Sequence, residues 1–180
     1  MISCSKLRMN IFISFFLFFA VRAARISRCS LRSPRWENLD LLEDENFPYT
    51  TKLLSSGKKV LLTDSIVSFH DAMRVCQAVC GRIFLPKSKE ENQEATEFIK
   101  NNGAEFVWLR TSDKYQEGVW TDLETLANLP VTFWGEDQPK QKEQDYAILA
   151  RNGWWAGWTG NADYIMILCE LPPKITIHKN

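Results

Sequence analysis

A charged stretch in the second half of the chain carries residues able to bind a charged partner. Lys140 and Lys142 lie there among Glu136, Asp137 and Glu143. Such a mixture is typical of a loop that binds a protein or an anionic glycan, and equally of an ordinary solvated surface loop. Both interpretations stay open on the sequence alone.

A cluster of tryptophans follows this stretch, in the sequence Trp154-Trp155-Ala156-Gly157-Trp158. Successive side chains of a strand point to opposite faces, so three tryptophans in five residues cannot all face one way. At least one exposed ring is therefore expected, and it would form a platform for a sugar ring or a protein partner. The alternative is that the tryptophans fill the core. Trp155 and Trp158 are the candidate binding residues.

Catalytic and metal-binding patterns are missing from the sequence. The two histidines, His70 and His178, are far apart, and the Cys76–Cys80 spacing is not a redox C-x-x-C motif. No G-x-S-x-G, H-E-x-x-H, P-loop or dinucleotide fingerprint occurs. We expect neither an enzyme nor a structural zinc site.

The amino terminus has the pattern of a secretory signal peptide. Lys6 and Arg8 precede the apolar run of residues 11–21, and small or medium residues surround a cleavage point after Ala23. Removing residues 1–23 would leave four cysteines, an even number that favours disulfides in a secreted, extracellular protein. We find no other run long enough for a membrane span, which needs about 20 apolar residues.

The charge balance argues against a nucleic-acid partner, because Lys+Arg and Asp+Glu both number 22. We divide the chain into a signal peptide (1–23), an extension or short neck (24–57), one domain (58–172) and a tail (173–180). Length and composition suit a single compact domain.

Within the domain, hydrophobic spacing predicts an α+β arrangement with a loop-rich second half. Strands are expected at 60–63, 83–85, 106–109, 145–150 and 164–171. Ser68 and Ser88 begin two helices, and Ser88 with Glu91 forms a complete capping box. The second helix should bury one face, which comprises Glu91, Ala95, Phe98 and Ile99.

Seven segments, in order, resemble the C-type lectin-like domain family, with the collectin version as the nearest relative. Their order and spacing, rather than any single segment, make the resemblance specific. They are Phe69-x-x-Ala72-x-x-x-Cys76, Gly81 to Pro86, Ser88-x-x-Glu91-Asn92, Phe106 to Leu109, Glu117-Gly118-Val119-Trp120, Trp134-x-x-x-Gln138-Pro139 and Cys169-Glu170-Leu171.

The resemblance implies a fold of two helices, antiparallel sheets and a long loop region. It also implies a disulfide between Cys76 and Cys169. Cys29 and Cys80 would then form a second disulfide. The alternative leaves Cys80 as a buried thiol and Cys29 available to link a disulfide-bonded oligomer.

The chain departs from the family where sugar-binding members hold calcium. Lys140 stands where the E-P-N or Q-P-D tripeptide supplies an oxygen, and a protonated lysine cannot coordinate a cation. The Asn-Asp pair expected after a late tryptophan is also missing, because Ala156-Gly157 follows Trp155 and Thr159-Gly160 follows Trp158, although Asn161 and Asp163 lie nearby. We therefore expect no cofactor, with the usual calcium site degenerate.

The inner disulfide of the family is also missing. Tyr146 follows Asp145 where one cysteine is expected, and no cysteine occurs at residues 159–161. We predict that Tyr146 packs where a sulfur would lie. Asp145 remains as an acid near the site.

These features predict a secreted lectin-like protein that recognises a glycan, or a secreted or cell-surface protein, without the usual calcium-dependent site. The candidate ligand-binding residues are Glu136, Gln138, Lys140, Asp145, Trp155 and Trp158. The alternative is a structural or regulatory subunit of a secreted disulfide-linked oligomer that binds no sugar.

Overall fold

The computed structural model describes residues 49–161 and 164–172. The predicted signal peptide, the first part of the extension, Cys29, Asp163 and the tail from residue 173 lie outside these ranges. Among the described residues, no helix is long and apolar enough to cross a bilayer.

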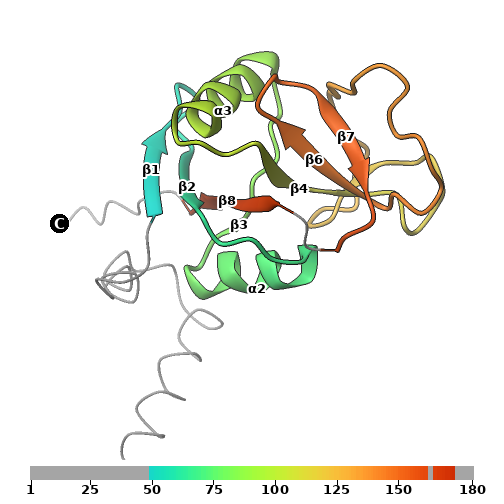
Figure 1. Cartoon of the computed structure of the whole chain (residues 1–180), viewed down its shortest axis with the longest axis horizontal. Coiled ribbons are helices and arrows are strands. Elements are labelled where there is room, and N and C mark those ends of the chain that lie inside the picture. The colour runs from blue at the N-terminus through green and yellow to red at the C-terminus, as the bar shows by residue number, and fades with distance from the viewer. Residues whose placement is uncertain (1–48, 162–163, 173–180) are drawn as a thin grey trace, which may run out of the picture. The chain divides into compact units, whose positions relative to one another are not determined.

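The strands join into one mixed sheet between two helices, which confirms the α+β prediction (Figure 1). The strand order is β1-β2-β8-β4-β6-β7, with β3 beside β8 and β5 beside β4. The strands are β1 (Tyr49–Leu53), β2 (Lys59–Thr63), β3 (Arg82–Ile83), β4 (Phe106–Ser112), β5 (Thr121–Asp122), β6 (Tyr146–Ala150), β7 (Trp155–Trp158) and β8 (Ile165–Leu171).

The pairing differs from the expected antiparallel sheets at one place. β4 runs parallel to β8, with Phe106 opposite Ile165 and Val107 opposite Met166. β1 also lies in the segment that we expected to be part of the extension, and it pairs with β2 along its whole length. Both are corrections to the sequence-based prediction.

The two helices cover opposite faces of the sheet (Figure 1). α2 (Phe69–Ala78) begins at Ser68, whose hydroxyl accepts the Asp71 N–H. α3 (Lys89–Asn101) begins at Ser88, whose hydroxyl accepts the Glu91 N–H. Both predicted helix starts are confirmed, because these hydroxyls satisfy backbone donors that have no partner inside the helix.

The predicted buried face of α3 is also confirmed, and it includes a carboxylate. Ala95, Phe98 and Ile99 pack in one core with the inner faces of β4, β6 and β8. Glu91 is buried beside them, where its Oε2 accepts hydrogen bonds from Lys58 Nζ at 2.6 Å and the Lys87 N–H at 2.8 Å. These donors offset the cost of burying the charge and attach α3 to the loop before β2.

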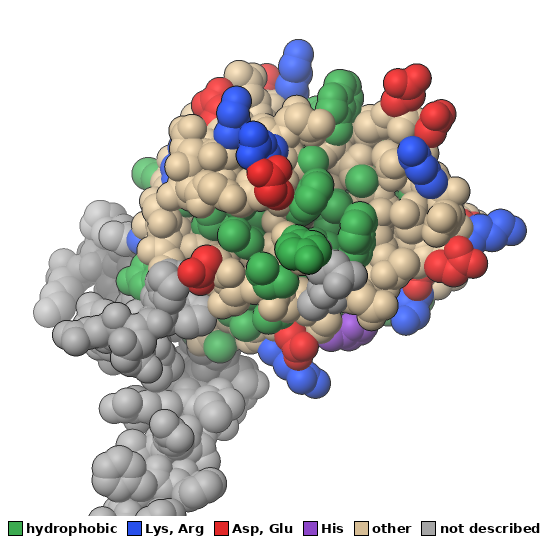
Figure 2. Space-filling view, viewed as in Figure 1, with side chains coloured by type: hydrophobic (Ala, Val, Ile, Leu, Met, Phe, Trp, Pro, Cys, Tyr) green, Lys and Arg blue, Asp and Glu red, His purple; other side chains and the backbone are tan. Residues whose placement is uncertain are grey.

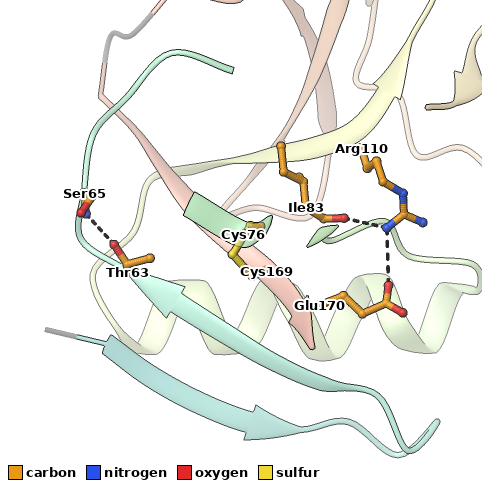
Figure 3. Close-up of a disulfide and its surroundings, with 7 residues drawn as sticks. All are labelled: Thr63, Ser65, Cys76, Ile83, Arg110, Cys169 and Glu170. Carbon is orange, nitrogen blue, oxygen red and sulfur yellow. Dashed lines mark hydrogen bonds and ion pairs between the residues drawn. A yellow bond between two sulfur atoms is a disulfide. The ribbon is translucent and has the colours of Figure 1, made fainter. Parts of the chain in front are cut away.

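The second core lies under α2 and is closed by the predicted disulfide. Cys76 on α2 and Cys169 on β8 are bonded, with their Cα atoms 5.4 Å apart (Figure 3). Both residues are fully buried. Cys80 is also disulfide-bonded, which excludes the free-thiol alternative, but its partner lies outside the described residues. The Cys29–Cys80 pairing stays a prediction.

A buried group of charges fixes β4 to β5, where the long loop begins. Arg110 donates from Nε to Asp122 Oδ1 at 2.9 Å, from Nη2 to Asp122 Oδ2 at 3.1 Å and from Nη1 to the Ile83 carbonyl at 2.7 Å. Glu170 Oε2 lies 3.7 Å from Arg110 Nη1 and has no hydrogen-bond donor among the described residues (Figure 3). Arg110 therefore compensates two buried carboxylates.

The Asp122 carboxyl should make the domain sensitive to acid. Burial raises its pKa, but the Arg110 hydrogen bonds, the Glu124 N–H and the charges of Arg110 and Lys87 outweigh this effect and hold the pKa below its ordinary value. The unfolded chain binds this proton first, near pH 4, so the stabilisation is present above about pH 4 and is lost as pH falls through the folded-state pKa.

We expect the free energy of unfolding to fall as the pH drops below about 4, and to fall less steeply in Asp122→Asn. Urea denaturation at a series of pH values measures both slopes. Parallel curves for the two proteins would show that Asp122 does not contribute to the acid sensitivity.

Candidate functional site

The long loop (residues 123–145) connects β5 to β6 and lies at the end of the molecule away from β1 (Figure 1). Its later part is attached to β7 by backbone hydrogen bonds. The Trp155 N–H donates to Phe133 O at 2.7 Å, and the Gly135 N–H donates to Trp155 O at 2.9 Å. Lys, Arg, Asp and Glu side chains of both signs lie along this end of the surface (Figure 2).

Aromatic rings of the loop pack against tryptophans of the core. Trp134 contacts Trp120 with ring centroids 4.6 Å apart and Trp155 at 5.7 Å, and Phe133 contacts Trp155 at 5.6 Å. Edge-to-face pairs at these distances are favourable beyond their buried area. The loop is therefore packed onto the core without a covalent link of its own.

Trp155 belongs to that core, which corrects its place among the candidate ligand-binding residues. Its exposed fraction is 0%, and its Nε1 donates to Asn92 Oδ1 at 2.8 Å. Trp158 is partly buried, and its Nε1 is shielded from solvent and has no hydrogen-bond partner in residues 49–161 and 164–172. Neither indole has the exposure of a stacking platform.

Trp154 is the exposed ring that the clustered tryptophans predicted, although it was not among the candidate residues. Its exposed fraction is 55%, and its backbone N–H donates to Asn152 Oδ1 at 3.1 Å. A methyl group added at Gly135 would lie 3.6 Å from Trp154 Cβ. Trp154 thus borders the long loop. The strand β7 itself was not predicted, and its start at Trp155, which turns this ring inward, could not be read from the alternation alone.

Gln138 is partly buried, and its side chain binds the backbone of β7. Its Oε1 accepts the Gly157 N–H at 3.2 Å, and the Gln138–Pro139 peptide bond is cis. Its candidate neighbours have different surroundings: Glu136 and Lys140 are exposed, whereas Asp145 is partly buried. The structure therefore brings Gln138 to β7 but leaves Glu136 and Lys140 on the outer surface.

Gln144, which we did not single out from the sequence, is partly buried and binds the backbone of the loop through its side chain. Its Oε1 accepts the N–H groups of Lys140 at 2.8 Å and Gln141 at 3.1 Å. The Gln144 N–H donates to Gln141 O at 3.1 Å and closes the turn. Local sequence does not mark such a residue, because its partners are backbone groups common to every residue.

Gly157, one of the two positions where the resemblance expects an acidic calcium ligand, has no room for a side chain. A Cβ added at Gly157 would lie 2.7 Å from Pro139 Cβ and 2.9 Å from Gln144 Cβ. Non-bonded carbon atoms essentially never come this close, so a carboxylate side chain at this position would displace the loop.

The residues present do not suit calcium at this position. Calcium takes six to eight oxygen ligands, several of them carboxylates. Here Gln138 Oε1 and Gln144 Oε1 already accept backbone N–H groups, and Lys140 and Gly157 supply no side-chain oxygen. Within residues 49–161 and 164–172, no group of three or more His, Cys, Asp or Glu side chains is arranged to hold a metal ion.

The predicted role of Tyr146 at the missing inner disulfide is supported by its contacts. Its buried ring stacks on Phe69 with centroids 4.2 Å apart. A Cβ added at Gly160 would lie 2.7 Å from the Tyr146 ring, and the Gly160 carbonyl accepts the Phe69 N–H at 3.0 Å. An aromatic ring against a glycine thus joins β6 to the segment after β7. Asn161 is exposed there.

Comparison with known proteins places these features in one family. Residues 65–170 match the profile described as Lectin C-type domain. The CD209 antigen of Pongo pygmaeus is 30% identical over 101 residues, which cover 54% of this chain and 25% of that protein. The chain thus matches about a quarter of the length of this curated relative.

Solved structures share the fold at lower identity. The mouse scavenger receptor C-type lectin carbohydrate-recognition domain has a TM-score of 0.62 at 22% identity, covering 71% of this chain and 97% of that one. A calcium-independent type II antifreeze protein has a TM-score of 0.58 at 14% identity, covering 69% and 96%. With more than half of its residues matching the family profile, this chain belongs to the C-type lectin domain family.

Proposed function

We propose that this domain is a non-enzymatic recognition module that binds a glycan or protein ligand without calcium in the usual site. The packing of Pro139 and Gln144 against Gly157 carries the proposal, because it fills the space that a carboxylate side chain at position 157 would need.

The proposed contact surface is the outer side of the long loop together with Trp154. Glu136, Lys140 and Lys142 are exposed on the loop, and Trp154 supplies a flat apolar ring beside it. Exposed aromatic rings with polar neighbours are typical of binding hot spots. The mouse relative is a carbohydrate-recognition domain, which supports glycans as one ligand class.

Secretion is part of the same proposal. The signal-peptide pattern of residues 1–23 and the buried Cys76–Cys169 disulfide both suit an oxidising compartment. Glycans and secreted or cell-surface proteins are the ligand classes available there.

A glycan array and an array of secreted proteins, each probed with excess calcium and with chelator, test the proposal. We expect the same ligands and equal affinities in both conditions. Binding that disappears with chelator would contradict calcium independence. The absence of binding on both arrays would contradict the recognition function.

Trp154→Ala is expected to weaken binding of any ligand found by at least about tenfold, because a central aromatic contact carries energy of this order. Tyr164→Ala is the matched control, since Tyr164 is also strongly exposed but lies next to β8. Titration calorimetry of both variants measures the difference. Equal losses of affinity in the two variants, or no loss of affinity in Trp154→Ala, would show that Trp154 is not part of the binding site.

A further inference from the structure

We infer that Gln144 and Gly157 are positioning residues that hold the long loop in its binding conformation without a cation. The inference rests on the proposed function. The Gln144 amide binds the loop backbone, and Gly157, which has no side chain, leaves room for the loop to pack on β7. Neither residue is proposed to touch the ligand.

The Gln144 amide oxygen binds two backbone N–H groups of the loop. A carbonyl oxygen has two lone pairs, and here both are used, by the N–H groups of Lys140 and Gln141. The bond from the Gln144 N–H to Gln141 O completes the turn. Three hydrogen bonds thus fix the backbone that carries the exposed Lys140 and Lys142 side chains.

Gly157 lets this turn pack directly onto β7. The Gly157 backbone is not in the left-handed region, so glycine is needed here for space and not for its conformation. Its N–H donates to Gln138 Oε1, and its α-carbon faces Pro139 and Gln144. The two ends of the charged stretch are therefore fastened to the same residue of β7.

A loop fastened by amide hydrogen bonds and van der Waals contact does not depend on a dissociable ion. Glutamine does not ionise, and its bonds to N–H groups do not change when calcium is removed. The loop should therefore present the same surface at any calcium concentration, which is a property of the free protein that can be measured without a ligand.

Amide hydrogen exchange and trypsin digestion of the loop test this inference. Trypsin cleaves after Lys140 and Lys142, both exposed, so cleavage there reports on loop opening. In the wild type we expect equal rates with calcium and with chelator. In Gln144→Ala and Gly157→Ala we expect exchange at Lys140 and Gln141, and cleavage after both lysines, to be at least about fivefold faster.

Two variants in the same loop are matched controls. Gln141→Ala removes an exposed amide side chain from the same turn. Gly135→Ala adds a methyl group whose nearest neighbours would be 3.5–3.6 Å away, an ordinary contact distance. Both should keep wild-type rates, and circular dichroism should confirm that all four variants are folded.

The outcomes separate this inference from the proposed function. Wild-type rates in Gln144→Ala and Gly157→Ala would overturn the inference and leave calcium-free binding standing. Loop protection that the wild type acquires only with calcium would overturn the inference directly. A calcium-independent loop in a protein that binds nothing on either array would uphold the inference and overturn the proposed function.

Discussion

Replacing Cys76 and Cys169 together by alanine is expected to lower the free energy of unfolding by about 4–5 kcal/mol, the largest effect predicted for the domain. The bond joins residues 93 positions apart, and a loop of this length loses much conformational entropy when it is closed in the unfolded chain. Both sulfurs also lie in the core between α2 and β8, so their removal leaves unfilled space.

Urea denaturation without reductant measures this loss. Gln77→Ala, at an exposed position on the same helix, is the control and should stay within about 0.5 kcal/mol of the wild type. A double cysteine variant within about 1 kcal/mol of the wild type would contradict the assignment of this bond as the main covalent support of the fold.

Arg110→Met is expected to cost about 3–5 kcal/mol, because it removes the positive charge from between two buried carboxylates. Asp122 would lose both of its hydrogen bonds to the guanidinium group. Glu170 Oε2 would lose its ion pair with Arg110 Nη1. The Ile83 carbonyl would lose a donor as well. The loss should loosen the β4–β5 pairing from which the long loop begins.

Arg82→Met is the control for this prediction. Arg82 also binds Glu170, at 2.7 Å, and it contacts Glu124, but its side chain is 41% exposed. Solvent screens such a pair, so we expect a loss of about 1 kcal/mol or less. Equal losses for Arg82→Met and Arg110→Met in urea denaturation would contradict the distinction between the buried and the exposed arginine.

The sequence predicted best what depends on local chemistry. Ser68 and Ser88 cap helices through groups three residues away, and this is visible in the order of residues. β1 was missed because its sequence, Tyr-Thr-Thr-Lys-Leu, lies at the sheet edge and is mostly exposed, so no buried face produces a hydrophobic alternation.

The site was only partly predictable, because contacts between distant segments decide it. The expectation that the usual calcium ligands are missing rests on Lys140 and on the residues that follow Trp155 and Trp158, and it stays a prediction. Which tryptophan is exposed depends on the direction of β7, and that strand was not predicted. The role of Gln144 depends on a turn that closes around its amide oxygen, and no residue pattern indicates such a turn.

The proposed calcium independence of the long loop is tested most directly by a crystal structure of the domain grown in excess calcium. We predict that Gln144 Oε1 lies within hydrogen-bond distance of the Lys140 and Gln141 N–H groups, with Pro139 packed on Gly157. We predict no ion near Gln138 Oε1. A calcium ion about 2.3–2.6 Å from Gln138 Oε1, with Gln144 turned away from the loop, would contradict the account.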